Sequence, residues 1–206
     1  MSESIAMNIV EIPRISVTPA EFREIHSIQD APVILEGLDW GPCCEKWADP
    51  EYVAQSVGSS EVRIHSSCHP ELDFVKKNFA YSTMALDELI RAAAKVEESN
   101  GAGDAERKYY YLRALGNDPR GREVADFRTH FPAIAEDFSV PDGLYPEEKH
   151  FSSVFRVSSA GLQLWTHYDV MDNILVQVSH QLLVVSTQNL QKNRFQVQTR
   201  HPHSSP

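Results

Sequence analysis

The sequence predicts an α+β protein, with helical segments first and strands clustered late around a β-sandwich or jelly-roll centre. Residues 18–28 and 86–96 carry apolar side chains at helical spacing. Residues 152–158 and 162–178 have the composition and alternation of strands. Between the two groups, residues 116–150 are rich in proline, glycine and acids, which is typical of a long connection with short helical pieces.

A capping signal predicts where the first helix begins. Residues 18–21 read Thr-Pro-Ala-Glu, which combines a capping box with proline at the first helical position. Phe22, Ile25 and Ile28 then follow at helical spacing. Residues 31–37, Ala-Pro-Val-Ile-Leu-Glu-Gly, are expected to form a short strand closed by glycine.

The middle of the chain predicts two further helices and two strands. Asp49 and Pro50 begin the second helix and Gly58 ends it. Residues 61–67 alternate like a strand, and residues 108–113, Lys-Tyr-Tyr-Tyr-Leu-Arg, are aromatic enough to form another. The third helix places five apolar residues on one face: Leu86, Leu89, Ile90, Ala93 and Val96.

Composition indicates a soluble, globular chain of one domain. It has 206 residues, of which 42% are hydrophobic and 23% charged. No apolar run approaches the roughly 20 residues that span a bilayer, so no membrane partner is expected. Cys43, Cys44 and Cys68 are an odd number with one adjacent pair, which does not make a disulfide framework. With no signal or transit peptide recognised, the expected location is cytoplasmic or nuclear.

Charge is spread unevenly along the chain. The formal net charge of −10 argues against broad, sequence-blind binding to nucleic acid, although it does not exclude a local basic patch. All 29 acids lie at or before Asp172, whereas residues 180–206 hold three basic residues and three histidines. This break predicts a domain over residues 1–179 and a divergent tail over residues 180–206, disordered or loosely attached apart from one possible strand near its start.

The pattern that carries chemistry lies in residues 161–178. On a strand, side chains two positions apart share a face, so His167 and Asp169 would point the same way. Such a pair, with a second histidine from elsewhere, makes the facial triad of non-haem Fe(II) oxygenases. Asn173 has the same strand parity and would face the same cavity.

A histidine followed two residues later by an acid is a weak signal when taken alone. The plainer interpretation of His167 and Asp169 is a partly buried histidine held by a neighbouring acid. The sequence also contains a second example, His69-Pro70-Glu71, which we reject because Pro70 would break a strand ladder.

The surrounding sequence resembles a known family. Residues 151–157, Phe-Ser-Ser-Val-Phe-Arg-Val, and residues 164–173, Leu-Trp-Thr-His-Tyr-Asp-Val-Met-Asp-Asn, are similar to the JmjC, cupin-barrel oxygenases that use Fe(II) and 2-oxoglutarate. Residues 32–38, 108–113 and 124–126 resemble the same family. Within it, the chain is most similar to the hydroxylases that act on a wybutosine precursor in tRNA(Phe).

The resemblance implies a fold, a set of cofactors and four site residues. It implies N-terminal helices and strands packed on a double-stranded β-helix, with His167 and Asp169 as metal ligands for Fe(II). Tyr111 and Asn173 would contact 2-oxoglutarate, which O2 converts to succinate and carbon dioxide as the substrate is hydroxylated. Tyr111 could instead be a core aromatic residue, and Asn173 an ordinary polar residue near a strand end.

The resemblance ends after Ser179. The family has a lysine that pairs the distal carboxylate of 2-oxoglutarate, and the matching position here is Leu182, which cannot do so. The family's second histidine ligand lies on a strand far downstream. Neither His180 nor the pair His201 and His203 is expected to replace it. The jelly roll is therefore expected to be incomplete at its C-terminal end, with low stability, aggregation or dependence on a partner.

Three functions remain open from the sequence. The first is an Fe(II)- and 2-oxoglutarate-dependent hydroxylase of a wybutosine precursor in tRNA(Phe), impaired in this chain. The second is a JmjC hydroxylase of protein side chains. The third is a catalytically dead chain with only a binding role. The family's homodimer contacts lie in helices after the barrel, so a native-like homodimer is not expected.

Overall fold

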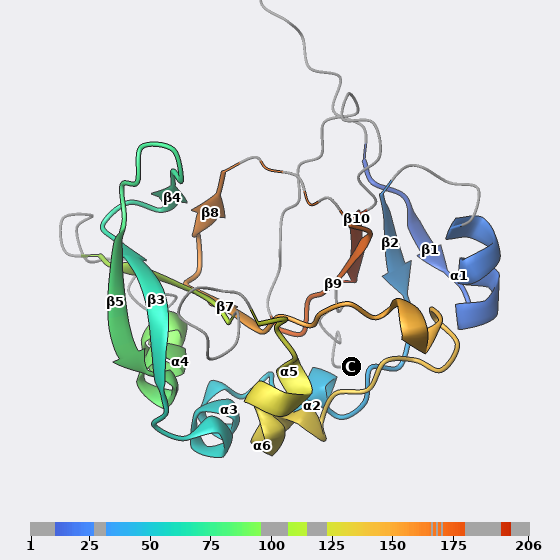
Figure 1. Cartoon of the computed structure of the whole chain (residues 1–206), viewed down its shortest axis with the longest axis horizontal. Coiled ribbons are helices and arrows are strands. Elements are labelled where there is room, and N and C mark those ends of the chain that lie inside the picture. Colours follow the sequence, from blue (N-terminus) through green and yellow to red (C-terminus); the bar gives the residue numbers. More distant parts are fainter. Residues whose placement is uncertain are drawn as a thin grey trace, which may run out of the picture. The chain divides into compact units, whose positions relative to one another are not determined.

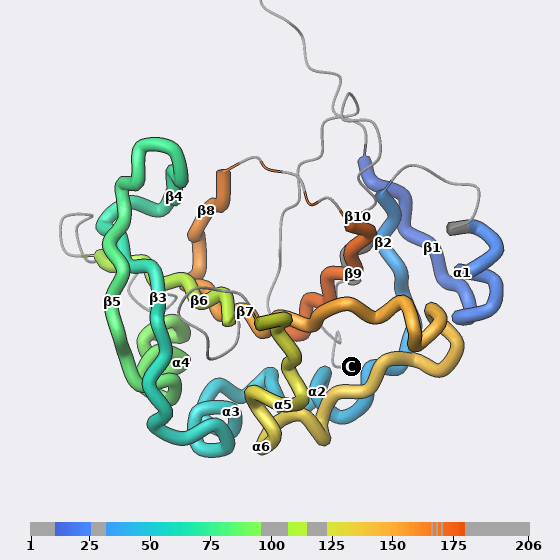
Figure 2. Tube along the Cα trace, in the orientation of Figure 1, coloured from blue at the N-terminus to red at the C-terminus, as the bar shows by residue number. Residues whose placement is uncertain are grey.

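The computed structural model describes residues 11–26, 32–95, 107–114, 123–165, 167, 169, 171–179 and 195–198. The chain divides into two compact units, which Figure 1 and Figure 2 trace along the sequence. Unit 1 comprises Met1–Leu38, Asp142–Leu144 and Tyr168–Pro206, and unit 2 comprises Asp39–Pro141 and Tyr145–His167.

Both units mix helices with strands. The elements of unit 1, in chain order, are β1 (Arg14–Ser16), α1 (Pro19–His26), β2 (Val33–Glu36), β9 (Asn173–Val176) and β10 (Phe195–Gln198). The elements of unit 2 are α2 (Cys43–Lys46), α3 (Pro50–Val57), β3 (Glu61–Ser67), β4 (Glu71–Leu72), β5 (Ala80–Ala85), α4 (Leu86–Lys95), β6 (Tyr109–Arg113), α5 (Phe127–His130), α6 (Pro132–Ala135), the 3-10 helix η1 (Glu147–Lys149), β7 (Arg156–Ser158) and β8 (Gln163–Leu164).

Helix α1 begins with the capping box that the sequence predicted. The backbone N–H of Thr18 donates to Glu21 Oε2 at 2.8 Å, and the backbone N–H of Glu21 donates to Thr18 Oγ1 at 3.3 Å. The hydrogen bonds from Thr18 lower the pKa of Glu21. Two N–H groups that the helix itself leaves without partners are therefore satisfied, and the predicted start of this helix is confirmed.

The sheet of unit 1 is parallel and has the strand order β1-β2-β10-β9. Strand β10 pairs with β2 on one side and with β9 on the other, with Gln196 opposite Val33 and Val197 opposite Leu175. The sequence predicted no strand at these positions, and its prediction of a divergent, disordered tail over residues 180–206 as a whole stays a prediction. Phe-Gln-Val-Gln alternates with period two, but its partners are remote in sequence. The rest of the predicted tail lies outside the described residues.

The main sheet of unit 2 is antiparallel and has the order β5-β3-β6-β7. Its predicted strands β3 and β6 are confirmed. Helix α4 lies against one face, where Ile64 and Leu112 of the sheet and Leu89 of the helix are buried. The apolar stripe of α4 therefore covers that face, as its helical spacing predicted. The opposite face carries the side chains of His65 and Tyr111, which lie opposite each other in the register.

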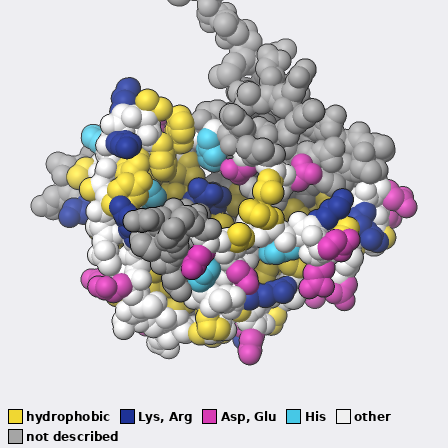
Figure 3. Space-filling model, viewed as in Figure 1, with side chains coloured by type: hydrophobic (Ala, Val, Ile, Leu, Met, Phe, Trp, Pro, Cys, Tyr) yellow, Lys and Arg dark blue, Asp and Glu magenta, His cyan; other side chains and the backbone are white. Residues whose placement is uncertain are grey.

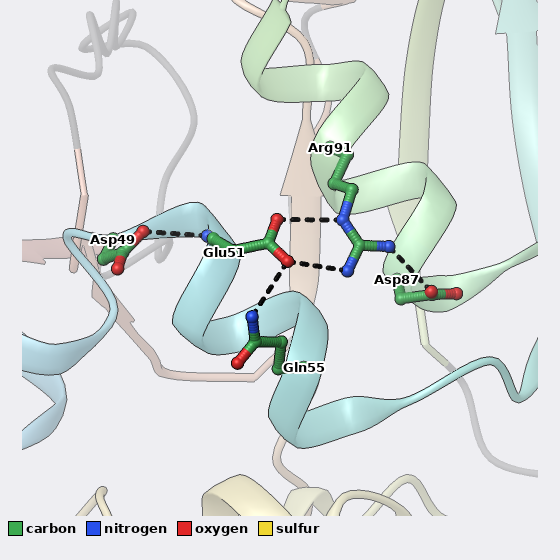
Figure 4. A network of polar contacts seen from close by, with 5 residues as sticks. All are labelled: Asp49, Glu51, Gln55, Asp87 and Arg91. Atoms are coloured by element: carbon green, nitrogen blue, oxygen red, sulfur yellow. Dashed lines mark hydrogen bonds and ion pairs between the residues drawn. The ribbon is translucent and has the colours of Figure 1, made fainter.

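Helices α3 and α4 are joined by an ion-pair network, drawn in Figure 4. Arg91 of α4 donates from Nε and Nη2 to both carboxylate oxygens of Glu51 in α3, at 2.9 Å each, and from Nη1 to Asp87 at 2.8 Å. Hydrogen bonds from Arg91 and Gln55 lower the pKa of Glu51 to about 2. Asp49 caps α3 by accepting from the Glu51 N–H at 2.9 Å, as its position before Pro50 predicted.

One predicted strand is wrong. The sequence predicted a continuous strand over residues 162–178, whereas the structure has two short strands that belong to different sheets. Strand β8 pairs with β4 in unit 2, and β9 pairs with β10 in unit 1. His167 and Asp169 lie between them, outside any strand. A strand needs a hydrogen-bonding neighbour, and alternation in one segment does not supply it.

The core of unit 2 contains a set of packed rings that we call the buried cluster. Its members are three buried rings, Trp40, Trp47 and Phe127, and three half-buried rings, Phe131, Phe138 and Phe155. Asp137 lies beside them, 4% exposed, and accepts hydrogen bonds from Trp47 Nε1 at 3.2 Å, Tyr52 Oη at 2.7 Å and Lys46 Nζ at 2.5 Å. The buried carboxylate is therefore satisfied by three donors, as a stable core requires.

Cys43 lies next to this core and is a buried free thiol. Burial, with the nearby Cys44, raises the pKa of Cys43 to about 12. The thiol therefore keeps its proton at neutral pH and donates to the Trp40 carbonyl at 3.3 Å.

The described residues agree with the predicted α+β class. Their strands form three separate sheets, one of them wholly antiparallel, and none of these closes into a barrel. In the same residues, no helix has the length and apolar character to cross a membrane.

Candidate functional site

The face of the β5-β3-β6-β7 sheet opposite α4 holds the predicted site residue Tyr111. In the sheet register His65 lies between Tyr81 of β5 and Tyr111 of β6. Tyr111 is 4% exposed, and its hydroxyl accepts a hydrogen bond from Arg156 Nη1 at 3.3 Å. The hydroxyl oxygen is thus held by a cation and keeps its own proton for donation.

His65 is oriented by the same strand. Its Nδ1 donates to the Tyr111 carbonyl at 3.3 Å, since a carbonyl can only accept. Burial lowers the pKa of His65, and the nearby Arg63 and Arg113 lower it further, against the opposing effect of the Tyr111 hydrogen bond. The uncharged imidazole is therefore favoured in the fold.

His167 adopts the tautomer that a metal ligand needs. Its Nδ1 lies 2.8 Å from the carbonyl oxygen of Trp165, so Nδ1 carries the proton. In the neutral ring, the second nitrogen, Nε2, presents a lone pair. Histidine ligands commonly donate their other ring N–H to a backbone carbonyl, which fixes the ring and raises its basicity.

Asp169 is oriented by the other predicted residue on this segment. Asn173, at the start of β9, donates from Nδ2 to Asp169 Oδ2 at 2.9 Å. The sequence placed Asn173 in the same cavity by strand parity, whereas the structure joins it directly to the predicted metal ligand. Its predicted contact with 2-oxoglutarate stays a prediction.

The predicted residues divide between the two units. Tyr111 and His167 belong to unit 2, while Asp169 and Asn173 belong to unit 1. By covalent geometry alone, positions two residues apart have Cα atoms within about 7 Å. The imidazole of His167 and the carboxylate of Asp169, the two predicted metal donors, are thus separated by one residue along the chain.

The chemistry of these two donors fits Fe(II), which accepts imidazole nitrogen and carboxylate oxygen. The described part of the chain contains no group of three or more His, Cys, Asp or Glu residues that could hold a metal ion. Leu182 and the three histidines of the tail, His180, His201 and His203, lie outside it. The rejected histidine, His69, lies in a bend, where its N–H donates to Ser67 Oγ at 2.9 Å.

Sequence reasoning missed Arg156 and His65 as neighbours of Tyr111. Their proximity depends on the register of three strands, in which Arg113 lies opposite Arg156. The only local signal was the arginine inside the resembled motif of residues 151–157. No rule based on composition or spacing pairs Arg156 with Tyr111.

Comparison with known proteins places these residues in a family. The Cupin-like domain family matches residues 19–181. The chain is 46% identical over 178 residues to tRNA wybutosine-synthesizing protein 5 of Gallus gallus, covering 85% of this chain and 54% of that protein. The Homo sapiens protein of the same name is 46% identical over 175 residues, with 84% and 54% covered.

A second group of relatives matches the same region. The tRNA wybutosine-synthesizing protein 4 of Neurospora crassa is 37% identical over 177 residues, which cover 85% of this chain and 14% of that protein. The chain spans about half the length of the protein 5 relatives. The family match includes Tyr111, His167, Asp169 and Asn173, and the chain belongs to the family of cupin-like domains.

Proposed function

We propose that this chain takes part in wybutosine synthesis, as an Fe(II)- and 2-oxoglutarate-dependent hydroxylase of a wybutosine precursor in tRNA(Phe). Relatives at 46% identity are named for wybutosine synthesis, which supports the substrate. The observation that carries the metal chemistry is the hydrogen bond between His167 Nδ1 and the Trp165 carbonyl, which leaves Nε2 of the neutral ring for a metal.

His167 and Asp169 would hold the iron through Nε2 and the carboxylate. Asn173 fixes the carboxylate by its hydrogen bond to Oδ2, so the acid is oriented before any metal binds. Bound with 2-oxoglutarate and O2, Fe(II) supplies a coupled oxidation, in which decarboxylation of 2-oxoglutarate to succinate accompanies hydroxylation of an unactivated C–H bond.

Tyr111 and Arg156 would bind a carboxylate of 2-oxoglutarate. The Tyr111 hydroxyl accepts from Arg156 and can donate its own proton to a carboxylate oxygen. The guanidinium adds positive charge beside the same hydroxyl, and charge-assisted hydrogen bonds of this kind are the stronger ones. Arg156 thereby offers a cation for 2-oxoglutarate that does not depend on position 182.

Succinate release tests the whole proposal. The purified chain is supplied with Fe(II), 2-oxoglutarate, O2 and tRNA(Phe) that carries the wybutosine precursor. We expect turnover that His167→Ala abolishes and His69→Ala leaves intact, since His69 belongs to the second His-x-acid pattern but lies in a bend. Turnover that survives His167→Ala, or is absent from the wild-type chain, would contradict the proposal. Turnover with peptides but not tRNA would indicate a protein hydroxylase instead.

Metal binding without turnover gives an independent readout. Mn²⁺, a spectroscopic substitute for Fe(II), should bind the wild-type chain, and both His167→Ala and Asp169→Asn should abolish binding. Asn173→Ala should weaken it by about 10- to 100-fold, the usual cost of losing a residue that orients a ligand. Equal Mn²⁺ affinity for the wild type and Asp169→Asn would rule out this metal site, whatever the substrate.

A further inference from the structure

Unit 2 has a second set of rings, separate from the buried cluster, which we call the aromatic face. Its members are His65, Phe74, Phe79, Tyr81 and Trp165. Ring centroids of Phe74 and Phe79 lie 4.8 Å apart, those of His65 and Tyr81 4.8 Å apart, and those of Phe74 and Trp165 6.1 Å apart. The chain thus gathers residues from β3, β5 and two loops into one continuous aromatic surface.

The aromatic face is more exposed to solvent than the buried cluster. Tyr81 and Trp165 are 53% and 38% exposed, and Val75, which follows Phe74 in the sequence, is 73% exposed. Figure 3 shows hydrophobic side chains gathered over the part of the view where Figure 1 labels β4 and β8. Contiguous apolar patches left exposed on a protein surface often mark sites of interaction.

Arginines border the same face. Arg63 and Arg113 share strand parity with His65 and Tyr111 respectively, and Arg156 lies opposite Arg113. The guanidinium of Arg63 lies over the Tyr81 ring, 4.4 Å from its centroid. None of these three arginines forms a salt bridge with a carboxylate of the described residues. In a chain of net charge −10, this is a local concentration of positive charge.

Asp73, which adjoins Phe74 of the aromatic face in the sequence, does not offset this charge. Asp73 accepts hydrogen bonds from the backbone N–H groups of Val75 and Lys76, each at 2.9 Å. Its other oxygen lies 3.7 Å from Lys76 Nζ. The charge of Asp73 is therefore compensated within its own turn, by two backbone N–H groups and by the ammonium group of Lys76.

We propose that the aromatic face binds unpaired RNA, with a base stacked on Tyr81 or Trp165 and a phosphate paired with Arg63 or Arg113. This inference rests on the proposed function and says where the tRNA loop would meet the chain. Proteins recognise single-stranded RNA by stacking unpaired bases on aromatic rings and arginine planes beside positive charge. Purely apolar partners do not need the arginines, and 2-oxoglutarate has no flat ring for the exposed side chains.

Position links the aromatic face to the proposed metal site. The Trp165 carbonyl holds Nδ1 of His167 at 2.8 Å, so the exposed indole and the proposed ligand belong to one local structure. Trp165 precedes His167 by two residues, so a base stacked on its indole would bind next to the proposed metal ligand. Stacking there would take the base out of its loop and present its substituent for reaction.

Binding of a fluorescein-labelled RNA hairpin with an unpaired loop, followed by anisotropy, tests the inference on the whole chain. A blunt duplex of the same length is the comparison ligand. Tyr81→Ala and Trp165→Ala should each weaken hairpin binding between about 5-fold and 100-fold, the range for one stacked base. The matched control Phe151→Ala removes an aromatic side chain that is 58% exposed and lies outside this face, and should change nothing.

Intrinsic fluorescence distinguishes stacking from simple charge attraction. Trp40 and Trp47 are only 2% and 8% exposed, so quenching by added hairpin reports on Trp165. Trp165→Phe should abolish the quenching and keep affinity close to wild type, because the smaller ring still stacks. Tyr81→Phe should likewise bind as the wild type does. Binding without quenching, or equal losses for hairpin and duplex, would overturn the inference.

The outcomes separate this inference from the proposed function. Hairpin binding that depends on Tyr81, together with no succinate release, would sustain the aromatic face and remove the hydroxylase. Succinate release whose KM for tRNA is unchanged by Tyr81→Ala and Trp165→Ala would sustain the hydroxylase and overturn the role of the aromatic face. Displacement of the hairpin by 2-oxoglutarate alone, or by an acidic peptide with higher affinity, would assign the face to another ligand and overturn the inference.

Discussion

Unit 2 contains two aromatic clusters that differ in their surroundings rather than in their rings. In the buried cluster, the ring centroids of Trp47 and Phe127 lie 5.7 Å apart, and Trp47 is one of three donors to the buried carboxylate of Asp137. In the aromatic face, His65 and Phe79 are 4.9 Å apart beside arginines, and neighbouring rings are half exposed. Rings closed off from water contribute to stability, whereas the same rings left open provide a surface for recognition.

The largest difference between the two clusters should appear in the free energy of unfolding when a tryptophan of each is truncated to alanine. Trp40 is 2% exposed and stacks on Phe138 at 5.7 Å, so Trp40→Ala should lower the free energy of unfolding by about 3–5 kcal/mol. Trp165→Ala should lower it by less than about 1 kcal/mol, because the indole is partly exposed. Urea unfolding followed by circular dichroism measures both. Similar losses at the two positions would show that Trp165 contributes to the hydrophobic core as Trp40 does, and that the aromatic face is not an open surface.

The polar centre of the buried cluster should give the next largest effect. Asp137→Asn removes the charge that pairs with Lys46 and leaves donors from Trp47 and Tyr52 with a weaker acceptor. We expect a loss of about 2 kcal/mol in the free energy of unfolding at pH 7. The exposed neighbour variant Glu136→Gln is the control and should be close to neutral.

The Asp137 effect should also depend on pH in a defined direction. Burial alone would raise the pKa of Asp137, but hydrogen bonds from Lys46, Tyr52 and Trp47 outweigh it and hold the pKa below its ordinary value. A carboxylate with a lowered pKa in the fold adds stability above the unfolded pKa of about 4, and that stability is lost as the pH falls through the folded pKa. The gap between wild type and Asp137→Asn should therefore shrink below about pH 4. A gap that widens in acid would refute the assigned direction.

Local signals were the part of the fold that could be predicted. The caps at Thr18 and Asp49 depend on side chains within three residues of the helix, so the sequence shows both partners. Strands β5 and β10 were missed because their segments have weak patterns of their own and exist through pairing with β3, β2 and β9. Pairing between remote segments leaves no mark in a single sequence.

The candidate site divides in the same way. His167 and Asp169 were predicted from spacing and resemblance, although the strand assumed to carry them is absent. The groups that orient these two donors, the Trp165 carbonyl and the Asn173 amide, lie within four residues of them, yet no spacing rule predicts either hydrogen bond. The contact of Arg156 with Tyr111 depends on strand register and lay beyond sequence reasoning.

The smallest predicted effect concerns His65, which lies at the centre of the aromatic face. Burial and the charges of Arg63 and Arg113 lower its pKa, so the unfolded chain binds a proton there before the folded chain does. Stability from neutral His65 is therefore present above the unfolded pKa of about 6.5 and is lost as the pH falls from there through the folded pKa.

His65→Gln should remove this dependence while its amide can still donate to the Tyr111 carbonyl. At pH 7 the substitution should cost less than about 1 kcal/mol, the range of one cross-strand pair. Urea unfolding between pH 7 and pH 5 should then show a shallower fall for His65→Gln than for the wild type, with the exposed His69→Gln as control. Identical slopes for the wild type and His65→Gln would mean that the ring is as easily protonated in the fold as in water. The aromatic face would then be wetter, and less like the buried cluster, than its ring contacts indicate.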